Sequence, residues 1–286
     1  MRSFGIVFLI GAGLAAFAQD SNLKKAEDLY QHTNYQASLE LLKAAKPSTA
    51  AELGLIGRDY FMLGEFKQAT DWFQKAAALE PAKSEWAHWL GRAWGRRAET
   101  ASPLTAPLAA SKARQYFEQA VALDPHNSEA LDDLFDYYLQ APGFLGGGLD
   151  KAAATAQRIA ALDPAEGHFA FAQLADRRKQ YDTAEEQLRH AMELAPRQVG
   201  RALDLAKYLA KQGRVQESDA VFAQAERIAP NSPKVIYTRA KILIQQKRNL
   251  DQARSLLQKY MQCSLTPDDP PKSEAQRLLQ QVSTGV

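Results

Sequence analysis

Apolar and small residues follow a helical period along most of this chain. In the segment LGLIGRDYFMLGEFKQATDWFQKAAALEP, residues 53–81, bulky apolar side chains recur every three or four positions. Residues with this spacing lie on one face of an α-helix. Small residues such as Gly57 and Ala69 let two antiparallel helices approach, and the bulky residues fill the seam between them. The segment therefore predicts two helices joined by a turn at Gly64, and the second helix ends before Pro81.

The same pattern recurs at intervals close to 34 residues. Each copy ends at a proline, which ends or restarts a helix because it lacks an amide proton. Degenerate copies cover 23–47 and 235–265, so we expect about seven helix pairs. A final amphipathic segment, 271–284, predicts a helix whose polar face caps the last repeat. The repeat-end prolines are Pro81, Pro125, Pro164, Pro196 and Pro230, with separations of 44, 39, 32 and 34 residues.

The order of residues within one copy carries a family resemblance. The first clear copy contains, in sequence, Leu53, Ile56, Gly57, Tyr60, Gly64, Ala69, Phe73, Ala76 and Pro81. This order resembles the tetratricopeptide repeat, or TPR. The resemblance implies an all-α, right-handed α-solenoid of about seven helical hairpins plus a C-terminal capping helix, formed as one domain over 19–286. It also implies an inner groove lined by the first helix of each pair.

Two copies carry insertions. Extra residues near 95–110 include Pro103 and Pro107, which predict a projecting loop rather than a continuous helix.

The second insertion, 141–148, contains the glycine-rich segment Gly143–Gly148. A phosphate-binding loop would continue with Lys and then Ser or Thr, but Leu149 and Asp150 follow here, and Asp150 would repel a phosphate. We favour a flexible turn that tolerates added length. The alternative is a loop that contacts a ligand, because long glycine loops on rigid scaffolds often do so.

The N-terminus has the pattern of a secretory signal peptide. Arg2 is followed by an apolar stretch over 6–17, and Ala16-Phe17-Ala18 matches a cleavage site. We therefore expect residues 1–18 to be removed, which places the protein in the periplasm or outside the cell. The stretch is shorter than the roughly 20 residues of a membrane-spanning helix, and no later segment approaches that length. We expect no membrane span after cleavage.

Charge and composition limit the chemistry. The 35 basic and 33 acidic residues leave a net charge of +2, which disfavours a broad nucleic-acid-binding surface. Cys263 is the only cysteine, so an internal disulfide or a paired-thiolate zinc site is excluded. The five histidines fall in different copies without metal-ligand spacing, and no catalytic motif is present. The sequence predicts neither an enzyme nor a bound metal or cofactor.

The resemblance implies that set positions of each first helix face the groove. Transferred to this chain, they predict a groove with basic, acidic and again basic stripes. Met62, Glu85, Asp176, Arg177, Leu203 and Lys234 also occupy such positions. The principal predicted groove residues are Arg58, Phe61, His88, Arg92, Arg96, Glu129, Asp132, Asp136, Phe169, Gln173, Lys207, Lys211, Tyr237 and Lys241.

Glu129, Asp132 and Asp136 place three carboxylates on one helical face. A calcium site is disfavoured, because a straight helix cannot converge the six or more oxygens that calcium needs. The face is either solvated and ion-paired with Arg92 and Arg96, or it fixes the register of a charged peptide.

Four tryptophans cluster in neighbouring copies. We expect them mainly in the core, and any exposed remainder would form an aromatic patch for a partner. They are Trp72, Trp86, Trp89 and Trp94.

Together these patterns predict a non-enzymatic adaptor. It would bind a protein or peptide segment along the concave face and act in envelope or secretion assembly. The alternative is a small-ligand or glycan module in which the Gly143–Gly148 loop closes over a pocket. The partner's identity and the oligomeric state stay open.

Overall fold

The computed structural model describes residues 21–284, and every regular element among them is helical. The predicted signal peptide, 1–18, lies outside the described residues. The chain forms two compact units, and the first ends at Asp133. The boundary falls inside helix α7 (Ser128–Gln140).

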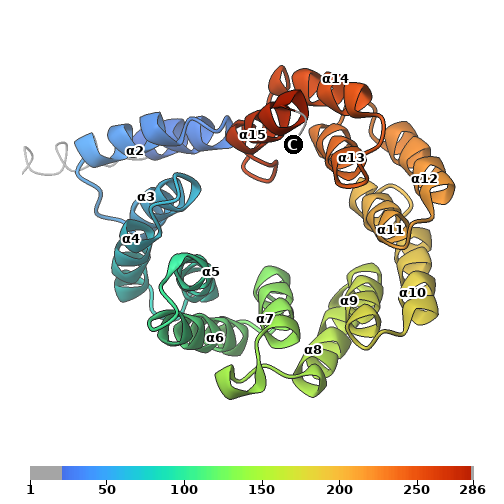
Figure 1. The fold of residues 1–286 in the computed structure, drawn as a ribbon. Coiled ribbons are helices and arrows are strands. Elements are labelled where there is room, and N and C mark those ends of the chain that lie inside the picture. The colour runs from blue at the N-terminus through green and yellow to red at the C-terminus, as the bar shows by residue number, and fades with distance from the viewer. Residues whose placement is uncertain (1–20, 285–286) are drawn as a thin grey trace, which may run out of the picture. The chain divides into compact units, whose positions relative to one another are not determined.

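Unit 1 is built from antiparallel helix pairs. Residues 21–31 are helical and precede α2. Helix α3 packs against α4, and α5 packs against α6 (Figure 1). The bounds are α2 (Tyr35–Ala44), α3 (Ala50–Met62), α4 (Phe66–Leu79), α5 (Ser84–Thr100) and α6 (Ala106–Leu123).

Unit 2 repeats this arrangement. Helix α8 packs against α9, α9 against α10, α11 against α12, and α13 against α14, while α15 lies against α14 (Figure 1). The helix α15 occupies the segment for which the sequence predicts a capping helix. The bounds are η1 (Gly143–Leu145), α8 (Leu149–Leu162), α9 (Pro164–Arg177), α10 (Tyr181–Leu194), α11 (Val199–Lys211), α12 (Val215–Ile228), α13 (Pro233–Gln245), α14 (Leu250–Met261) and α15 (Lys272–Thr284).

Local sequence signals explain where these helices begin and turn. Helix α3 starts at a capping box, in which Thr49 accepts from the Glu52 amide and Glu52 accepts from the Thr49 amide. The turns after α3 and α11 use Gly64 and Gly213, whose φ angles of 80° and 75° lie in the left-handed region. The prediction that these glycines form the turns is confirmed.

The core confirms the predicted repeat register. Ala69, Ala113 and Ala184 are 0%, 1% and 0% exposed, so the small residues do lie in the helix–helix seams. At Gly57 a β-carbon would come within 2.6 Å of the Phe73 ring. The helices therefore pack more closely than a larger residue would permit.

The first insertion differs from the predicted loop. Most of its residues lengthen the helices: α5 has 17 residues and α6 has 18, against 13 and 14 in α3 and α4. Only residues 101–105 connect them. Pro107 causes no break, because it occupies the first turn of α6, where no amide proton is needed.

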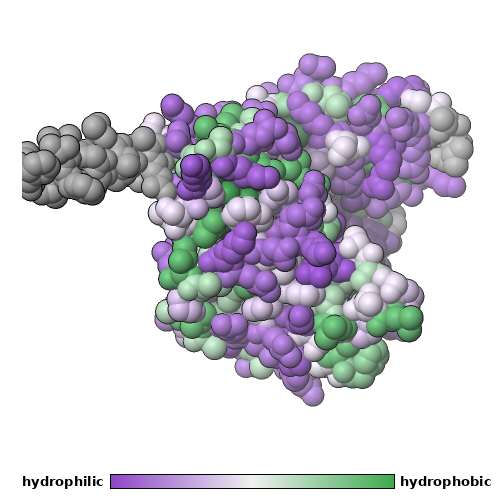
Figure 2. Space-filling view, turned by 90° about the vertical axis from the view of Figure 1, so that its left-hand side faces the viewer, coloured by the Kyte–Doolittle hydropathy of each residue, from purple (hydrophilic) through white to green (hydrophobic). Residues whose placement is uncertain are grey.

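The face in Figure 2 is largely hydrophilic, with hydrophobic residues in separate patches. Within the described chain, no helix is both long enough and apolar enough to cross a membrane.

Candidate functional site

The first helices of unit 1 carry three arginines over aromatic rings, and we call this surface the arginine face. It comprises Arg58 of α3, Arg92 and Arg96 of α5, and the rings of Phe61, Trp89 and Phe66. The Arg92 guanidinium carbon lies 4.4 Å from the Trp89 ring centroid and 5.3 Å from that of Phe61. Arg58 lies 6.0 Å from Trp89, and Arg96 lies 5.2 Å from Phe66. Stacking on rings orients the guanidinium planes while their edges stay available to acceptors.

Two of these arginines, Arg58 and Arg92, form only long ion pairs with nearby carboxylates. Arg58 lies 4.0 Å from Glu85, and Arg92 lies 3.7 Å from Asp133. Arg96 pairs closely with Glu99 of its own helix. The Arg58 Nε is buried and has no hydrogen-bond partner among the described residues. The arginine face therefore keeps donor capacity that its own carboxylates do not use.

A buried carboxyl lies next to this face. Asp59 is fully buried, and the Ser38 hydroxyl of α2 donates to its Oδ2 at 2.8 Å. Burial raises the pKa of Asp59 to about 7, although the Ser38 hydrogen bond and the Arg58 charge oppose the rise.

His88 does not face an open groove, which corrects the prediction for this residue. It is 2% exposed, between Trp89 and Phe117, and its Nε2 lies 2.7 Å from Asp133 Oδ2. Its Nδ1 lies 3.8 Å from the exposed Glu129. The imidazole is therefore used to join α5 to α7.

Helix α7 places the Asp133 carboxylate, which is not among the predicted groove residues, 3.7 Å from Arg92 Nε, and the acidic stripe itself stays a prediction. Asp132 and Asp136 lie half-buried on the same helix. Within residues 21–284, no group of three or more His, Cys, Asp or Glu side chains is placed to hold a metal ion.

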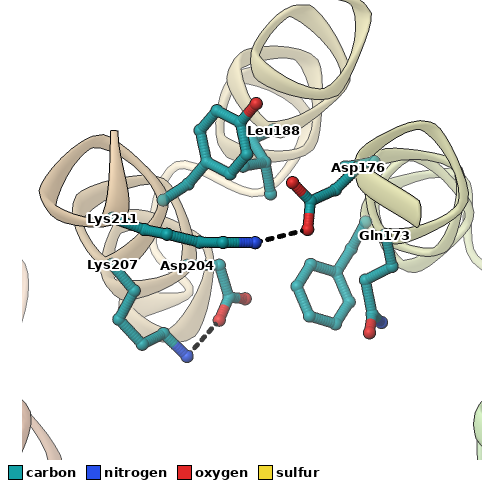
Figure 3. Close-up of a pocket in the computed structure, with 9 residues that line it drawn as sticks. Gln173, Asp176, Leu188, Asp204, Lys207 and Lys211 are labelled. Atoms are coloured by element: carbon teal, nitrogen blue, oxygen red, sulfur yellow. Dashed lines mark hydrogen bonds and ion pairs between the residues drawn. The ribbon is translucent and has the colours of Figure 1, made fainter. Parts of the chain in front are cut away.

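Unit 2 brings five predicted groove residues to one hollow, which we call the α9–α11 cavity. Its volume is about 270 Å³. Phe169, Ala172 and Leu188 contribute apolar surface, and Figure 3 shows Leu188 of α10 closing the far side. The lining residues are Phe169, Ala172, Gln173, Asp176, Leu188, Asp204, Lys207, Tyr208 and Lys211.

The charges around the cavity are closely paired. Lys211 reaches from α11 to Asp176 of α9 at 2.7 Å, and Lys207 lies 2.7 Å from Asp204 (Figure 3). Asp176 Oδ1 is buried and accepts no hydrogen bond from the described residues. The rim therefore alternates positive and negative groups around an apolar interior.

Arg201 supports the cavity from beside Phe169. Its guanidinium carbon lies 4.5 Å from the Phe169 ring centroid, and its Nη2 donates to Glu166 at 3.0 Å. Burial raises the pKa of Glu166, while the charge of Arg201 opposes that rise. These contacts fix the Phe169 ring between α9 and α11.

Tyr237 and Lys241 are not part of the cavity. Tyr237 is 4% exposed and packs against Tyr260 with ring centroids 5.2 Å apart, so its prediction as an open groove contact is wrong. Lys241 is exposed and lies 3.8 Å from Glu274 of α15. Here the capping helix covers a surface that an internal repeat would leave open.

The glycine-rich insertion is a structured turn rather than a flexible one. The Tyr137 hydroxyl donates to the Leu145 carbonyl at 2.9 Å, and the Gly148 amide donates to the Tyr138 carbonyl at 2.8 Å. A β-carbon at Gly147 would lie 1.9 Å from the Ala141 carbonyl oxygen. Gly147 is thus required by the fold of the turn itself. Ligand contact by this loop stays a prediction.

Three side chains that shape these surfaces are not among the predicted groove residues. Trp89 was expected mainly in the core, but it is half-buried and carries two arginines. Asp204 and Tyr208 line the cavity, and the Tyr208 hydroxyl donates to the Tyr181 carbonyl at 2.8 Å. The i, i+3 spacing of Asp204 and Lys207 was the available signal for their pairing. Trp86 and Trp94 are buried as predicted.

Comparison with known proteins identifies the fold. No protein-family profile matches the chain, and no curated protein matches it in sequence. Among solved structures, a tetratricopeptide repeat protein from Parabacteroides merdae is similar, with a TM-score of 0.61 and 16% identity. The match covers 93% of this chain and 98% of that one.

A TPR protein from Thermus thermophilus is also similar, with a TM-score of 0.56 and 22% identity over 67% of this chain and 98% of that one. The Cut9-Hcn1 hetero-tetramer of the APC/C matches with a TM-score of 0.52 and 14% identity, over 90% of this chain and 48% of that one. The chain therefore has the TPR fold, as the sequence predicts.

Proposed function

We propose that this protein is an interaction scaffold that binds an extended segment of a partner protein along the first-helix faces. The observation that carries the proposal is the α9–α11 cavity. Phe169 and Gln173 of α9 meet Lys207 and Lys211 of α11 there, as expected for a binding surface built from neighbouring repeats. Recognition would depend on surface complementarity, without a catalytic step.

The size and lining of the cavity favour a peptide side chain as its occupant. At about 270 Å³ it is smaller than the ~300–1,000 Å³ typical of small-molecule sites. An apolar side chain would contact Phe169 and Leu188, while Lys207 and Lys211 meet polar groups of the adjacent backbone. The partner segment is therefore expected to carry an apolar anchor flanked by polar residues.

The structural neighbours agree with a binding role. The Cut9-Hcn1 structure is a hetero-tetramer, so a protein with this fold is found there in complex with another. We propose the same general role for this chain, with the partner left unnamed.

The site of action is proposed from the N-terminal sequence. Residues 1–18 have the pattern of a secretory signal, so we propose that the mature protein acts in the periplasm or outside the cell, in envelope or secretion assembly. N-terminal sequencing of the protein from fractionated cells tests this: a mature terminus at Gln19 supports export, and an intact Met1 in the cytoplasmic fraction rejects it.

Site-specific crosslinking tests the binding surface. A photoreactive amino acid replaces Gln173, which lines the cavity, and in a matched variant it replaces Glu193, which is exposed at the end of α10. We expect one protein to crosslink at 173 and not at 193. Equal crosslinking at both positions, or none at 173, would reject the surface.

A variant that fills the α9–α11 cavity provides a second test. Gln173→Trp places a large ring at the cavity, and we expect it to reduce capture of the crosslinked partner about tenfold or more, as loss of a buried anchor does. Circular dichroism shows whether the variant keeps its helices. Full capture by a folded Gln173→Trp protein contradicts the proposal.

A further inference from the structure

The lengthened α5–α6 hairpin exposes two leucines at its end. Leu104 is 92% exposed and Leu108 is 65% exposed. The other exposed large apolar side chains described in unit 1 reach at most 54%, at Leu79. Exposed apolar side chains lower solubility, so two neighbouring leucines with this exposure indicate a candidate contact surface. We call residues 100–111 the hairpin end.

The hairpin end carries no charge. None of its twelve residues, TASPLTAPLAAS, is acidic or basic, although 24% of the whole chain is charged. Charged residues appear only before it, at Glu99, and after it, at Lys112.

Two cations lie just behind the hairpin end. The Arg97 guanidinium carbon is 3.7 Å from the Trp94 ring centroid, and Lys112 Nζ is 4.2 Å from the same centroid. Neither cation is ion-paired with a carboxylate among the described residues, whereas the neighbouring Arg96 and Arg114 pair with Glu99 and Glu118. Trp94 thus holds one unpaired cation from each helix next to the apolar end.

We propose that the hairpin end inserts into the surface of an anionic lipid bilayer. Leu104 and Leu108 would enter the boundary between headgroups and acyl chains, and Arg97 and Lys112 would meet the phosphates. This contact is separate from the partner-binding role proposed above, and it uses none of the residues of the arginine face or the α9–α11 cavity.

The geometry favours lipid over a protein partner. A stable protein interface buries about 800 Å² on each side, which two leucines at the end of one hairpin do not supply. A bilayer surface accepts a few protruding apolar side chains and adds attraction for unpaired cations. The glycine-rich turn of unit 2 exposes Phe144 by 83%, but the charged residues that bracket its uncharged stretch, Asp136 and Asp150, are both acidic. The proposed lipid contact is therefore confined to the α5–α6 hairpin.

A local fluorescent probe tests the insertion in the full chain. In a Cys263→Ser background, Leu104→Cys is labelled with an environment-sensitive dye, and Leu79→Cys serves as the matched exposed leucine of unit 1. Phosphatidylcholine vesicles with and without phosphatidylglycerol are added. We expect a blue shift at 104 with the anionic vesicles and none at 79. No shift at 104, or equal shifts at both positions, would overturn the proposal.

Two further variants separate the lipid contact from other causes. Arg97→Gln with Lys112→Gln should raise the anionic lipid concentration for half-maximal shift about thirtyfold, from the loss of two cations near the surface. Leu108→Ser should also reduce the shift at 104. An unchanged response in both variants contradicts the proposal. A shift at 104 that appears without vesicles and grows with protein concentration would show self-association and overturn it as well.

Discussion

The basic residues on the first helices have different partners in the two units: aromatic rings in unit 1 and carboxylates in unit 2. On the arginine face of unit 1, Arg58 and Arg92 lie over Trp89, 4.0 Å from the Glu85 carboxylate and 3.7 Å from the Asp133 carboxylate, respectively. Around the α9–α11 cavity of unit 2, Lys207 and Lys211 each lie 2.7 Å from a carboxylate. Equivalent positions of one repeat thus yield an electropositive, aromatic surface in one unit and a neutralised rim in the other.

Asp59 of unit 1 and Glu185 of unit 2 have pKa values shifted in opposite directions. Asp59 of unit 1 is buried with a hydroxyl as its hydrogen-bond donor, and its pKa is raised to about 7. Glu185 of unit 2 is also subject to burial, but hydrogen bonds from Arg214 and Arg189 outweigh this effect and lower its pKa. The repeat fixes where helices pack, while the partners supplied by neighbouring helices decide the ionisation of each carboxyl. The stabilisation that Asp59 gives unit 1 and the stabilisation that Glu185 gives unit 2 should therefore change with pH in opposite directions.

The largest expected effect is the pH dependence of unit 1. A raised folded-state pKa means that the stability from protonated Asp59 is fully present below its ordinary value of 3.8 and is lost as pH rises to about 7. At about 1.4 kcal/mol per pKa unit, the loss is on the order of 4 kcal/mol. Urea unfolding followed by tryptophan fluorescence measures it, because Trp72, Trp86, Trp89 and Trp94 all lie in unit 1.

Asp59→Asn is the matched variant for this measurement. It keeps the shape of the protonated carboxyl and an acceptor for Ser38, so we expect its tryptophan-detected stability to change little between pH 4 and pH 8. A wild-type protein whose unit 1 is equally stable at both pH values, or a variant with the same pH slope as wild type, would show that Asp59 is not the titrating group.

The next effect tests the aromatic support of the arginine face. Trp89→Leu removes the ring that lies 5.4 Å from Phe73 and carries Arg58 and Arg92. We expect about 2–3 kcal/mol of lost stability in urea unfolding, from reduced packing and two lost cation–π contacts.

Lys211→Met is the control from unit 2. It removes an ion pair whose lysine is 63% exposed, so we expect a change of at most about 1 kcal/mol by circular dichroism. Equal losses of stability in Trp89→Leu and Lys211→Met would show that the ring under the arginines contributes no more than the ion pair at the cavity.

Features that depend on residues close together in the sequence could be predicted, whereas contacts between residues of different copies could not. The helix pairs and turns depend on residues within one copy, so Gly64, Ala69 and Ala184 could be placed from spacing alone. Side-chain partners come from other copies. His88 has a groove position in its own helix, yet it is buried because Asp133, 45 residues later, accepts its hydrogen bond.

The burial of Asp59 follows from the spacing of residues along α3. It lies three residues after the fully buried Ile56, so the helical period places a carboxyl on the apolar side of α3. The period predicts its burial, but the Ser38 partner on α2 could not be inferred from local spacing. The α9–α11 cavity is similar: the predicted positions converge there, while its volume depends on how Leu188 and Phe169 pack.

A smaller effect tests the arginine pair on Glu185. Because the folded-state pKa of Glu185 is lowered, its contribution to stability is present above the ordinary value of 4.5 and is lost as pH falls. Arg214→Gln should therefore lower the stability of unit 2 at pH 7 and leave it nearly unchanged at pH 3. Amide exchange in α10 and α12 provides the measurement. An equal loss at both pH values would assign the effect to packing rather than charge.

The smallest effect concerns a feature that both units share, the left-handed residue between paired helices. Gly64 of unit 1 and Gly213 of unit 2 have this conformation, and so does Lys179 between α9 and α10, with φ of 61°. A side chain there costs up to about 1 kcal/mol relative to glycine, so Lys179→Gly should raise stability by roughly that amount and Gly213→Lys should lower it. Since Lys179 is exposed and absent from the cavity lining, the crosslinking at 173 should not change. Thermal unfolding of the two variants gives the comparison. A loss of stability in Lys179→Gly would mean that the flexibility glycine adds to the unfolded chain outweighs the strain it relieves at this turn.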